Sequence, residues 1–190
     1  MKSRLPAVTI VLSVADLLVL ALLHVLRTDV DPVTRPTSDY AHGSYGWLIV
    51  FATVGVGLAA IVLAVAVRPG VRGTAGQIGV GMLVFFGVAK IVQVFFPIDT
   101  AGQVTSAGVV HNTLGNVTFF ILPLAAVCVS VALRDRWSIG LAVALVLATA
   151  LVLSGAGGFG VAQRLYLVLG SGWLLVTALR VRSSHPVAAV

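Results

Sequence analysis

The stretch WLIVFATVGVGLAAIVLAVAV, from Trp47 to Val67, contains no charged residue. An α-helix rises about 1.5 Å per residue, so roughly 20 apolar residues cross the hydrocarbon core of a bilayer, which is about 30 Å thick. The stretch has this length and this composition. It therefore predicts a transmembrane helix.

The rest of the chain has the same character, because 59% of the 190 residues are hydrophobic and only 9% are charged. Soluble domains carry about 25% charged residues. We therefore expect an all-α integral membrane bundle of six transmembrane helices, forming one domain over residues 1–190. The predicted spans are Pro6–Leu26, Trp47–Val67, Ile78–Phe96, Val110–Leu133, Ile139–Gly160 and Leu165–Leu179.

Several classes of protein are disfavoured by the charged, histidine and cysteine residues. The net charge is +6, but the basic residues form short clusters between apolar runs and are not interleaved with aromatic residues. This pattern argues against nucleic-acid binding. Cys128 is the only cysteine, so it forms no intrachain disulfide and no Cys/His zinc motif. We expect neither a metal nor a cofactor. A His/Asp metal site is the alternative, but the H-x-x-x-H spacing is missing.

The arginines and lysines between the spans predict the orientation. Eight lie on the side of the termini, namely Lys2, Arg4, Arg68, Arg72, Arg134, Arg136, Arg180 and Arg182. Three lie on the opposite side, namely Arg27, Arg35 and Arg164. Cytoplasmic loops carry the excess of basic residues. We therefore expect a multi-pass protein of the cell membrane with both termini in the cytoplasm.

A set of polar residues gathers at the predicted outer ends of the helices: His42, Asp99, His111, Asn112, Gln163 and Arg164. A carboxylate and an imidazole suffice for acid–base chemistry, which favours Asp99 and His111 as the catalytic pair. Arg164 is suited to clamp an anionic group. His42, Asn112 and Gln163 complete the predicted substrate-binding set. The alternative is a structural role, in which Asp99 caps a helix or pairs with Arg164.

The fourth span carries a stripe of small and polar residues at helical spacing: Gly108, His111, Asn112, Gly115 and Asn116. This stripe predicts a helix face that turns toward the protein interior or a cavity, not toward lipid. Ordinary helix–helix contacts through glycine and asparagine are the other interpretation. The first loop, residues 27–46, contains Pro32 and Pro36 and is expected to form an ordered cap.

Two charged residues lie within the spans, Asp16 in the first and Lys90 in the third. An unpaired charge in the bilayer costs at least roughly 2.5–3.5 kcal/mol on insertion scales. The two residues fall at similar predicted depths, so we expect them to form a structural intramembrane pair. The alternatives are a Lys90 that reaches outward to Asp99 and an Asp16 that is neutral.

Four short motifs carry a resemblance to a known family: HGSYGW after the first loop, FPID closing the third span, the histidine opening the fourth, and VAQR before the sixth. Because the four motifs occur in this order, the chain resembles the six-span prokaryotic membrane family known as domain of unknown function 998. The resemblance implies six helices with polar ends and no established activity. The family-like positions are His42, Gly46, Pro97, Asp99, His111 and Arg164. Gln163 stands where the family often has a carboxylate.

Two functions fit this pattern. The first is a small membrane enzyme that uses acid–base chemistry on a lipid-like or isoprenoid substrate, since polar groups above an apolar funnel suit an amphiphile. The second is a non-catalytic membrane module that binds a lipid or a partner protein and assists in assembly, sensing or transport. Membrane lipids and amphiphilic small molecules are therefore the expected partners.

The predicted orientation places residues 97–109 outside the cell. In a variant in which Cys128 is replaced and Ser106 becomes cysteine, an impermeant maleimide should label intact cells, because the excess of basic residues holds the opposite ends inside. Labelling is compared before and after lysis. Labelling that occurs only after lysis contradicts the orientation.

Overall fold

The computed structural model describes residues 4–100 and 102–183. Within these ranges the chain forms six long helices, a short 3-10 helix and no strand. The elements are α1 (Arg4–Leu26), η1 (Thr37–Ala41), α2 (Gly46–Val67), α3 (Thr74–Gln93), α4 (Ser106–Leu133), α5 (Arg136–Ser154) and α6 (Phe159–Ser183). All six long helices have the length and hydropathy of membrane spans. The predicted all-α bundle of six spans is confirmed.

Some helix ends differ from the prediction for local reasons. The third helix ends at Gln93 rather than Phe96, and Pro97 follows, which disfavours helical backbone in the residue before it. The fifth helix ends at Ser154 rather than Gly160, because Gly155, Gly157 and Gly158 have positive φ angles and form a turn. Consequently α6 begins at Phe159, six residues before the predicted Leu165.

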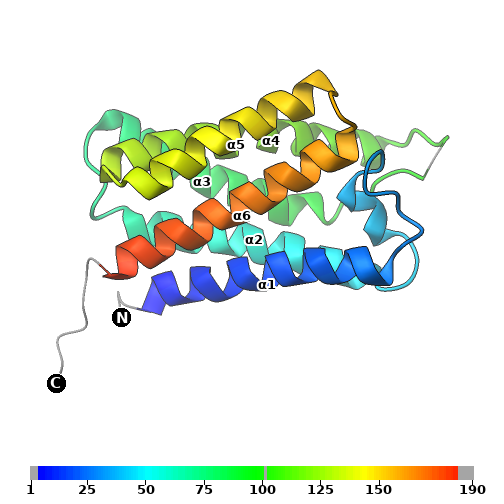
Figure 1. Cartoon of the computed structure of the whole chain (residues 1–190), viewed down its shortest axis with the longest axis horizontal. Coiled ribbons are helices and arrows are strands. Elements are labelled where there is room, and N and C mark those ends of the chain that lie inside the picture. The colour runs from blue at the N-terminus through cyan, green and yellow to red at the C-terminus, as the bar shows by residue number, and fades with distance from the viewer. Residues whose placement is uncertain (1–3, 101, 184–190) are drawn as a thin grey trace.

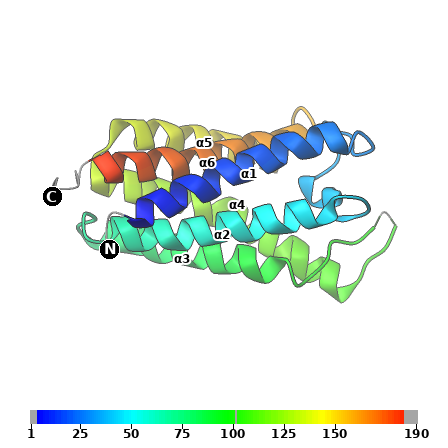
Figure 2. The same ribbon diagram turned by 90° about the horizontal axis from the view of Figure 1, so that it is seen from below.

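The helices form a closed ring in chain order (Figures 1 and 2). Each long helix packs beside the next, and α6 packs against α1 to complete the ring. The loops at residues 27–45, 94–100 with 102–105, and 155–158 lie together at one end, here called the distal end. The opposite, proximal end contains the beginning of α1 and the end of α6.

The proximal half of the ring is filled by a tight core. Trp173 and Leu63 are fully buried, and the Trp173 indole Nε1 donates a hydrogen bond of 2.9 Å to the Ser130 hydroxyl. Large apolar side chains such as Phe51 and Leu147 are exposed on the outer surface. This distribution suits a bundle surrounded by lipid.

The backbones of α2 and α3 touch at a pair of glycines. A Cβ atom added to Gly57 would lie 2.7 Å from the carbonyl oxygen of Gly87, and one added to Gly87 would also meet the Gly57 carbonyl oxygen. Small residues at such crossings let helices approach closely in membranes. The contact holds α2 and α3 closely side by side.

Replacing Gly57 with alanine should lower the thermal stability of the detergent-solubilised protein, since overpacking costs about 1–3 kcal/mol. Gly55→Ala is the matched control, because a Cβ atom there meets no atom within 4 Å. The melting temperatures of the two variants are compared with that of the wild type. Equal melting temperatures for Gly57→Ala and Gly55→Ala contradict the close approach.

Candidate functional site

A cavity of about 360 Å³ lies inside the distal half of the ring. Its walls come from α1, α2, α3, α4 and α6, and part of the first loop with η1 covers it. It extends from Thr37 and Gln163 near the distal end to Asp16 and Ser171. Asp16 precedes the end of α1 at Leu26 by 10 residues, or roughly 15 Å. The cavity therefore reaches well into the membrane-spanning part of the bundle.

Most of the polar stripe of α4 faces this cavity. His111, Asn112, Gly115 and Asn116 line it, as predicted, whereas Gly108 lies against Asp99 and not at the cavity. The Nδ1 atom of His111 lies 2.7 Å from the Phe96 carbonyl oxygen. A carbonyl only accepts hydrogen bonds, so Nδ1 carries the proton. In the neutral ring the Nε2 atom is then left as an acceptor, and it has no hydrogen-bond partner among the described residues.

Asp99 does not line the cavity but organises the beginning of α4. Its carboxylate accepts hydrogen bonds from the Thr105 hydroxyl at 2.6 Å and from the Thr105 backbone N–H at 3.0 Å. The Thr105 hydroxyl oxygen in turn accepts from the Gly108 N–H at 3.1 Å, as an N-cap does. The hydroxyl and the N–H of Thr105 hold the pKa of Asp99 below its ordinary value. This arrangement corresponds to the capping alternative.

Glycine is required at position 108 by the same contact. A Cβ atom there would overlap the Asp99 carboxylate. No hydrogen bond joins Asp99 to His111 within the described ranges, although the two groups interact electrostatically. The predicted catalytic pair is therefore close in space, but each member has its own partner.

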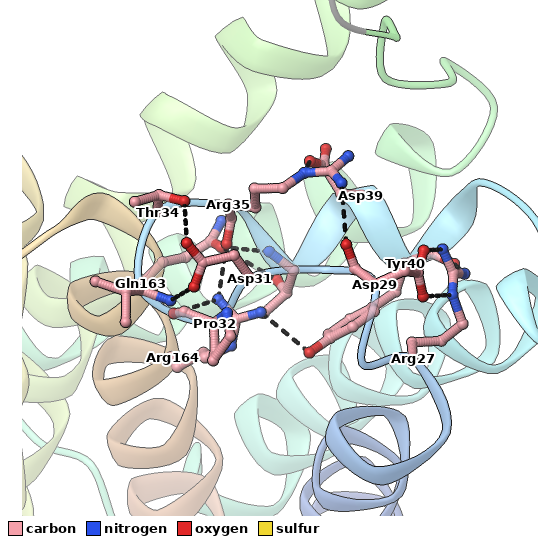
Figure 3. A network of polar contacts seen from close by, with 12 residues as sticks. Arg27, Asp29, Asp31, Pro32, Thr34, Arg35, Asp39, Tyr40, Gln163 and Arg164 are labelled. Atoms are coloured by element: carbon pink, nitrogen blue, oxygen red, sulfur yellow. Dashed lines mark hydrogen bonds and ion pairs between the residues drawn. The ribbon is translucent and has the colours of Figure 1, made fainter.

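Arg164 is buried and clamps the first loop, as Figure 3 shows. Its guanidinium donates to the carbonyl oxygens of Pro32 and Arg35, at 3.1 and 2.7 Å, and to the Tyr40 hydroxyl at 3.1 Å. It also donates to His24 Nε2 at 2.8 Å and to the Gly160 carbonyl at 3.1 Å. Arg164 is not one of the residues that line the cavity.

Asp99, His111 and Arg164 therefore do not meet at one cavity, contrary to what the sequence had led us to expect. The physical reason is that a buried guanidinium has five N–H donors to satisfy. Its acceptors are His24 on α1, Tyr40 and two carbonyls of the first loop, and a carbonyl of α6. They hold it beside α1 and the loop, while His111 faces the cavity from α4.

His24 takes part in this clamp as a neutral imidazole. Its Nδ1 lies 2.6 Å from the Leu20 carbonyl oxygen and must donate to it. Its Nε2 accepts from a guanidinium that can only donate. A charged imidazolium would have no acceptor left for Arg164. This hydrogen bond joins the distal end of α1 to α6.

The first loop forms the ordered cap expected from its prolines. Arg27 binds both carboxylate oxygens of Asp29 at 2.8 Å and donates to the carbonyl oxygens of Tyr40 and Ser44 at 3.0 Å (Figure 3). Hydrogen bonding to Arg27 lowers the pKa of the exposed Asp29. Gln163 accepts from the Thr37 backbone N–H at 2.7 Å and lines the cavity.

His42 lies beside the cavity and not on its wall. Its Nε2 atom is buried and has no hydrogen-bond partner among the described residues. It interacts electrostatically with His111. Of the predicted binding residues, Asn112 and Gln163 therefore face the cavity, while His42 lies next to it and Arg164 is separate.

The expected direct contact between Asp16 and Lys90 is not formed. The Asp16 carboxylate accepts from the Ser171 hydroxyl at 2.5 Å, and the Lys90 amine donates to the Gln93 side-chain oxygen at 2.6 Å. Both charged groups nevertheless line the same cavity and interact electrostatically.

The depths of these two residues explain the difference. The third helix begins at Thr74, four residues before the predicted Ile78, so Lys90 lies 16 residues along α3. Asp16 lies 12 residues along α1. At 1.5 Å per residue these positions correspond to roughly 24 and 18 Å, so Lys90 lies closer to the distal end.

Sequence reasoning missed several residues that complete these contacts. Thr105 had a local signal, because a threonine just before a helix is a preferred N-cap. Gln93 also had one, since it follows Lys90 by three residues on the same helix face. The partnerships of Arg164 with His24 and of Asp16 with Ser171 join residues far apart in the chain. No local pattern predicts them.

The fold and the cavity define an integral membrane protein, a closed ring of six transmembrane helices with a partly polar cavity in its distal half. The family model described as Protein of unknown function (DUF998) matches residues 10–180. The chain therefore belongs to this family, as the four motifs predicted. No curated protein matches the chain, and no solved structure matches it.

Replacing Arg164 with methionine should open the first loop, because hydrogen bonds to a charged group contribute about 1.5–3 kcal/mol. Trypsin should then cut the loop after Arg27 roughly tenfold faster or more, whereas the Arg35–Pro36 bond resists trypsin in both variants. Cleavage of protein purified in detergent is followed by mass spectrometry of the fragments. Arg136→Met, at the exposed start of α5, is the control, and equal cleavage of both variants contradicts the clamp.

Proposed function

We propose that the protein binds one small amphiphilic molecule, lipid-like or isoprenoid, in the cavity. The observation that carries this proposal is the composition of the cavity wall. Charged and polar side chains, among them Asp16, Lys90 and His111, share the wall with apolar ones. Concave sites with mostly apolar walls and a few polar groups are typical of small-molecule binding.

The size and the apolar surface of the cavity support a short single-chain ligand. Phe86, Phe119, Leu122 and Leu167 provide surface for a hydrocarbon chain. Small-molecule pockets span about 300–1,000 Å³, and 360 Å³ lies near the lower limit. This volume suits a single alkyl or prenyl chain with a compact head group better than a two-chain phospholipid.

A non-catalytic binding module fits the geometry better than the acid–base enzyme. An enzyme of the expected kind needs Asp99 and His111 to exchange protons with each other or with the ligand. Asp99 is instead hydrogen-bonded to Thr105 and stays ionised, since its pKa is lowered. It stabilises the N-terminus of α4 and does not line the cavity. The expected enzyme therefore lacks one of its two groups.

One observation favours the enzyme as a second candidate. The hydrogen bond from His111 Nδ1 to Phe96 leaves Nε2 as a potential base at the cavity wall. In this case His111 alone would accept a proton from the ligand, and Asn112 beside it would orient the head group. A ligand recovered chemically unchanged after incubation with the protein favours the module.

We infer from the basic residues that the distal end of the bundle, with its cavity, faces the outer leaflet of the cell membrane. Arg27 and Arg35 lie in the first loop and Arg164 near the distal start of α6, whereas the sequence has eight lysines and arginines on the side of the termini. An amphiphile could then enter from the outer leaflet beneath the first loop, whose Thr37 and Ser38 lie at the cavity.

A photoreactive diazirine analogue of farnesol should label the cavity-lining segments of α3, α4 and α6, because its apolar chain is stabilised by the buried walls. Excess farnesol should suppress the labelling. In Gly115→Leu the new side chain occupies part of the cavity. Labelling should then fall at least roughly tenfold, because a ligand that buries about two fewer CH₂ groups binds about tenfold more weakly. Labelled peptides are identified by mass spectrometry.

Gly140→Leu is the matched control, because a Cβ atom at Gly140 meets nothing within 4 Å and this glycine is exposed. Labelling of this variant should equal that of the wild type. Equal labelling in Gly115→Leu and Gly140→Leu, or labelling confined to lipid-facing peptides, contradicts binding in the cavity.

A further inference from the structure

The amine of Lys90 has unused hydrogen-bonding capacity inside the cavity. A lysine ammonium has three donors, and the hydrogen bond of 2.6 Å to Gln93 is the one that Lys90 forms within the described ranges. Gln93 itself is buried, and its Nε2 donates to the His111 carbonyl oxygen at 3.0 Å. The amine is therefore held in place from one side and faces the cavity with donors to spare.

We propose that Lys90 and Asn116 bind the head group of a monoanionic, carboxylate-bearing amphiphile. This inference rests on the proposed function and specifies the chemical class of its ligand. The carboxylate accepts hydrogen bonds from the Lys90 amine and the Asn116 amide, and its hydrocarbon chain lies along the apolar wall.

The register of α3 and α4 brings the two donors to similar depth. The two helices pack against each other in opposite directions, and Gln93 is joined to His111 between them. One helical turn deeper from Gln93 along α3 is Lys90. One turn deeper from Asn112 along α4 is Asn116. Both deeper residues line the cavity, and the Asn116 side chain has no hydrogen-bond partner among the described residues.

The charges of the cavity select a monoanion. Lys90 is the only lysine or arginine among the residues that line it, and Asp16 lines the same cavity. A carboxylate balances the charge of Lys90. A phosphate monoester brings nearly two negative charges, and Asp16 would repel the second one at low dielectric. The site has no arginine to compensate for it.

Dodecanoate and dodecanol test this selection, because they share one chain and differ in the head group. Each compound competes with the diazirine farnesol analogue for binding to the purified protein in detergent, and the remaining labelling is measured. The pH is high enough that dodecanoate is fully ionised. The wild type should prefer dodecanoate by roughly tenfold or more, since hydrogen bonds to a charged group are stronger than those to a neutral hydroxyl. In Lys90→Met this preference should disappear.

Three further variants keep the test decisive if Lys90→Met folds poorly. Asp16→Asn should increase the preference for dodecanoate, because it removes the repelling charge. Asn116→Ala should decrease the preference. Thr113→Ala should leave it unchanged, since Thr113 lies on α4 away from the cavity and donates to the Val109 carbonyl.

The outcomes separate this inference from the proposed function. If dodecanol competes as well as dodecanoate in the wild type, the carboxylate site is overturned while binding in the cavity stands. If the preference survives in Lys90→Met, or falls in Asp16→Asn, the site is likewise overturned. If neither compound displaces the photoreactive probe and the probe itself labels no cavity segment, the proposed function fails together with the inference.

Discussion

The buried guanidinium of Arg164 is the constraint on which the distal end of the bundle depends. An unsatisfied donor inside a membrane protein costs several kcal/mol, because no water is available to replace the lost hydrogen bond. Arg164 meets this requirement with His24 on α1, the carbonyls of Pro32 and Arg35, and the Tyr40 hydroxyl. The first loop must therefore fold back over the ring. Gln163, one residue earlier, binds Thr37 and brings the loop over the cavity.

The two halves of the ring are built differently. In the proximal half, apolar packing dominates, with Trp173 fully buried against Ser130. In the distal half the helices are joined by polar bridges, such as Gln93 to His111 between α3 and α4. Polar bridges fix the separation of the helices without filling the space between them. The cavity is the consequence, and it ends where Leu122 packs closely against Gly170.

The number of helices and the cavity-facing stripe of α4 could be predicted from the sequence, because both follow from periodicity and run length. The stripe of His111, Asn112 and Asn116 repeats at helical spacing, so its common direction did not depend on any partner. The role of Arg164 could not be predicted in this way. Two of its acceptors are the backbone carbonyls of residues 32 and 35. Every residue of the loop offers a carbonyl, so the sequence does not distinguish these two.

The direct contact between the two intramembrane charges was also predicted wrongly, because the helix limits were not known from the sequence. Apolar run length placed the starts of the first and third helices at Pro6 and Ile78, but they begin at Arg4 and Thr74. The offset between Lys90 and Asp16 therefore grows from two residues to four, or by roughly 3 Å. A direct ion pair would have neutralised both charges and left the cavity with neutral walls. Instead, each charge has one neutral partner, Ser171 for Asp16 and Gln93 for Lys90. Hydrogen bonds from neutral groups stabilise a buried charge only in part, and ionisable residues within spans generally serve a pathway or a ligand. The unequal depths of Asp16 and Lys90 therefore leave both charged groups on the wall of the cavity without a direct contact between them.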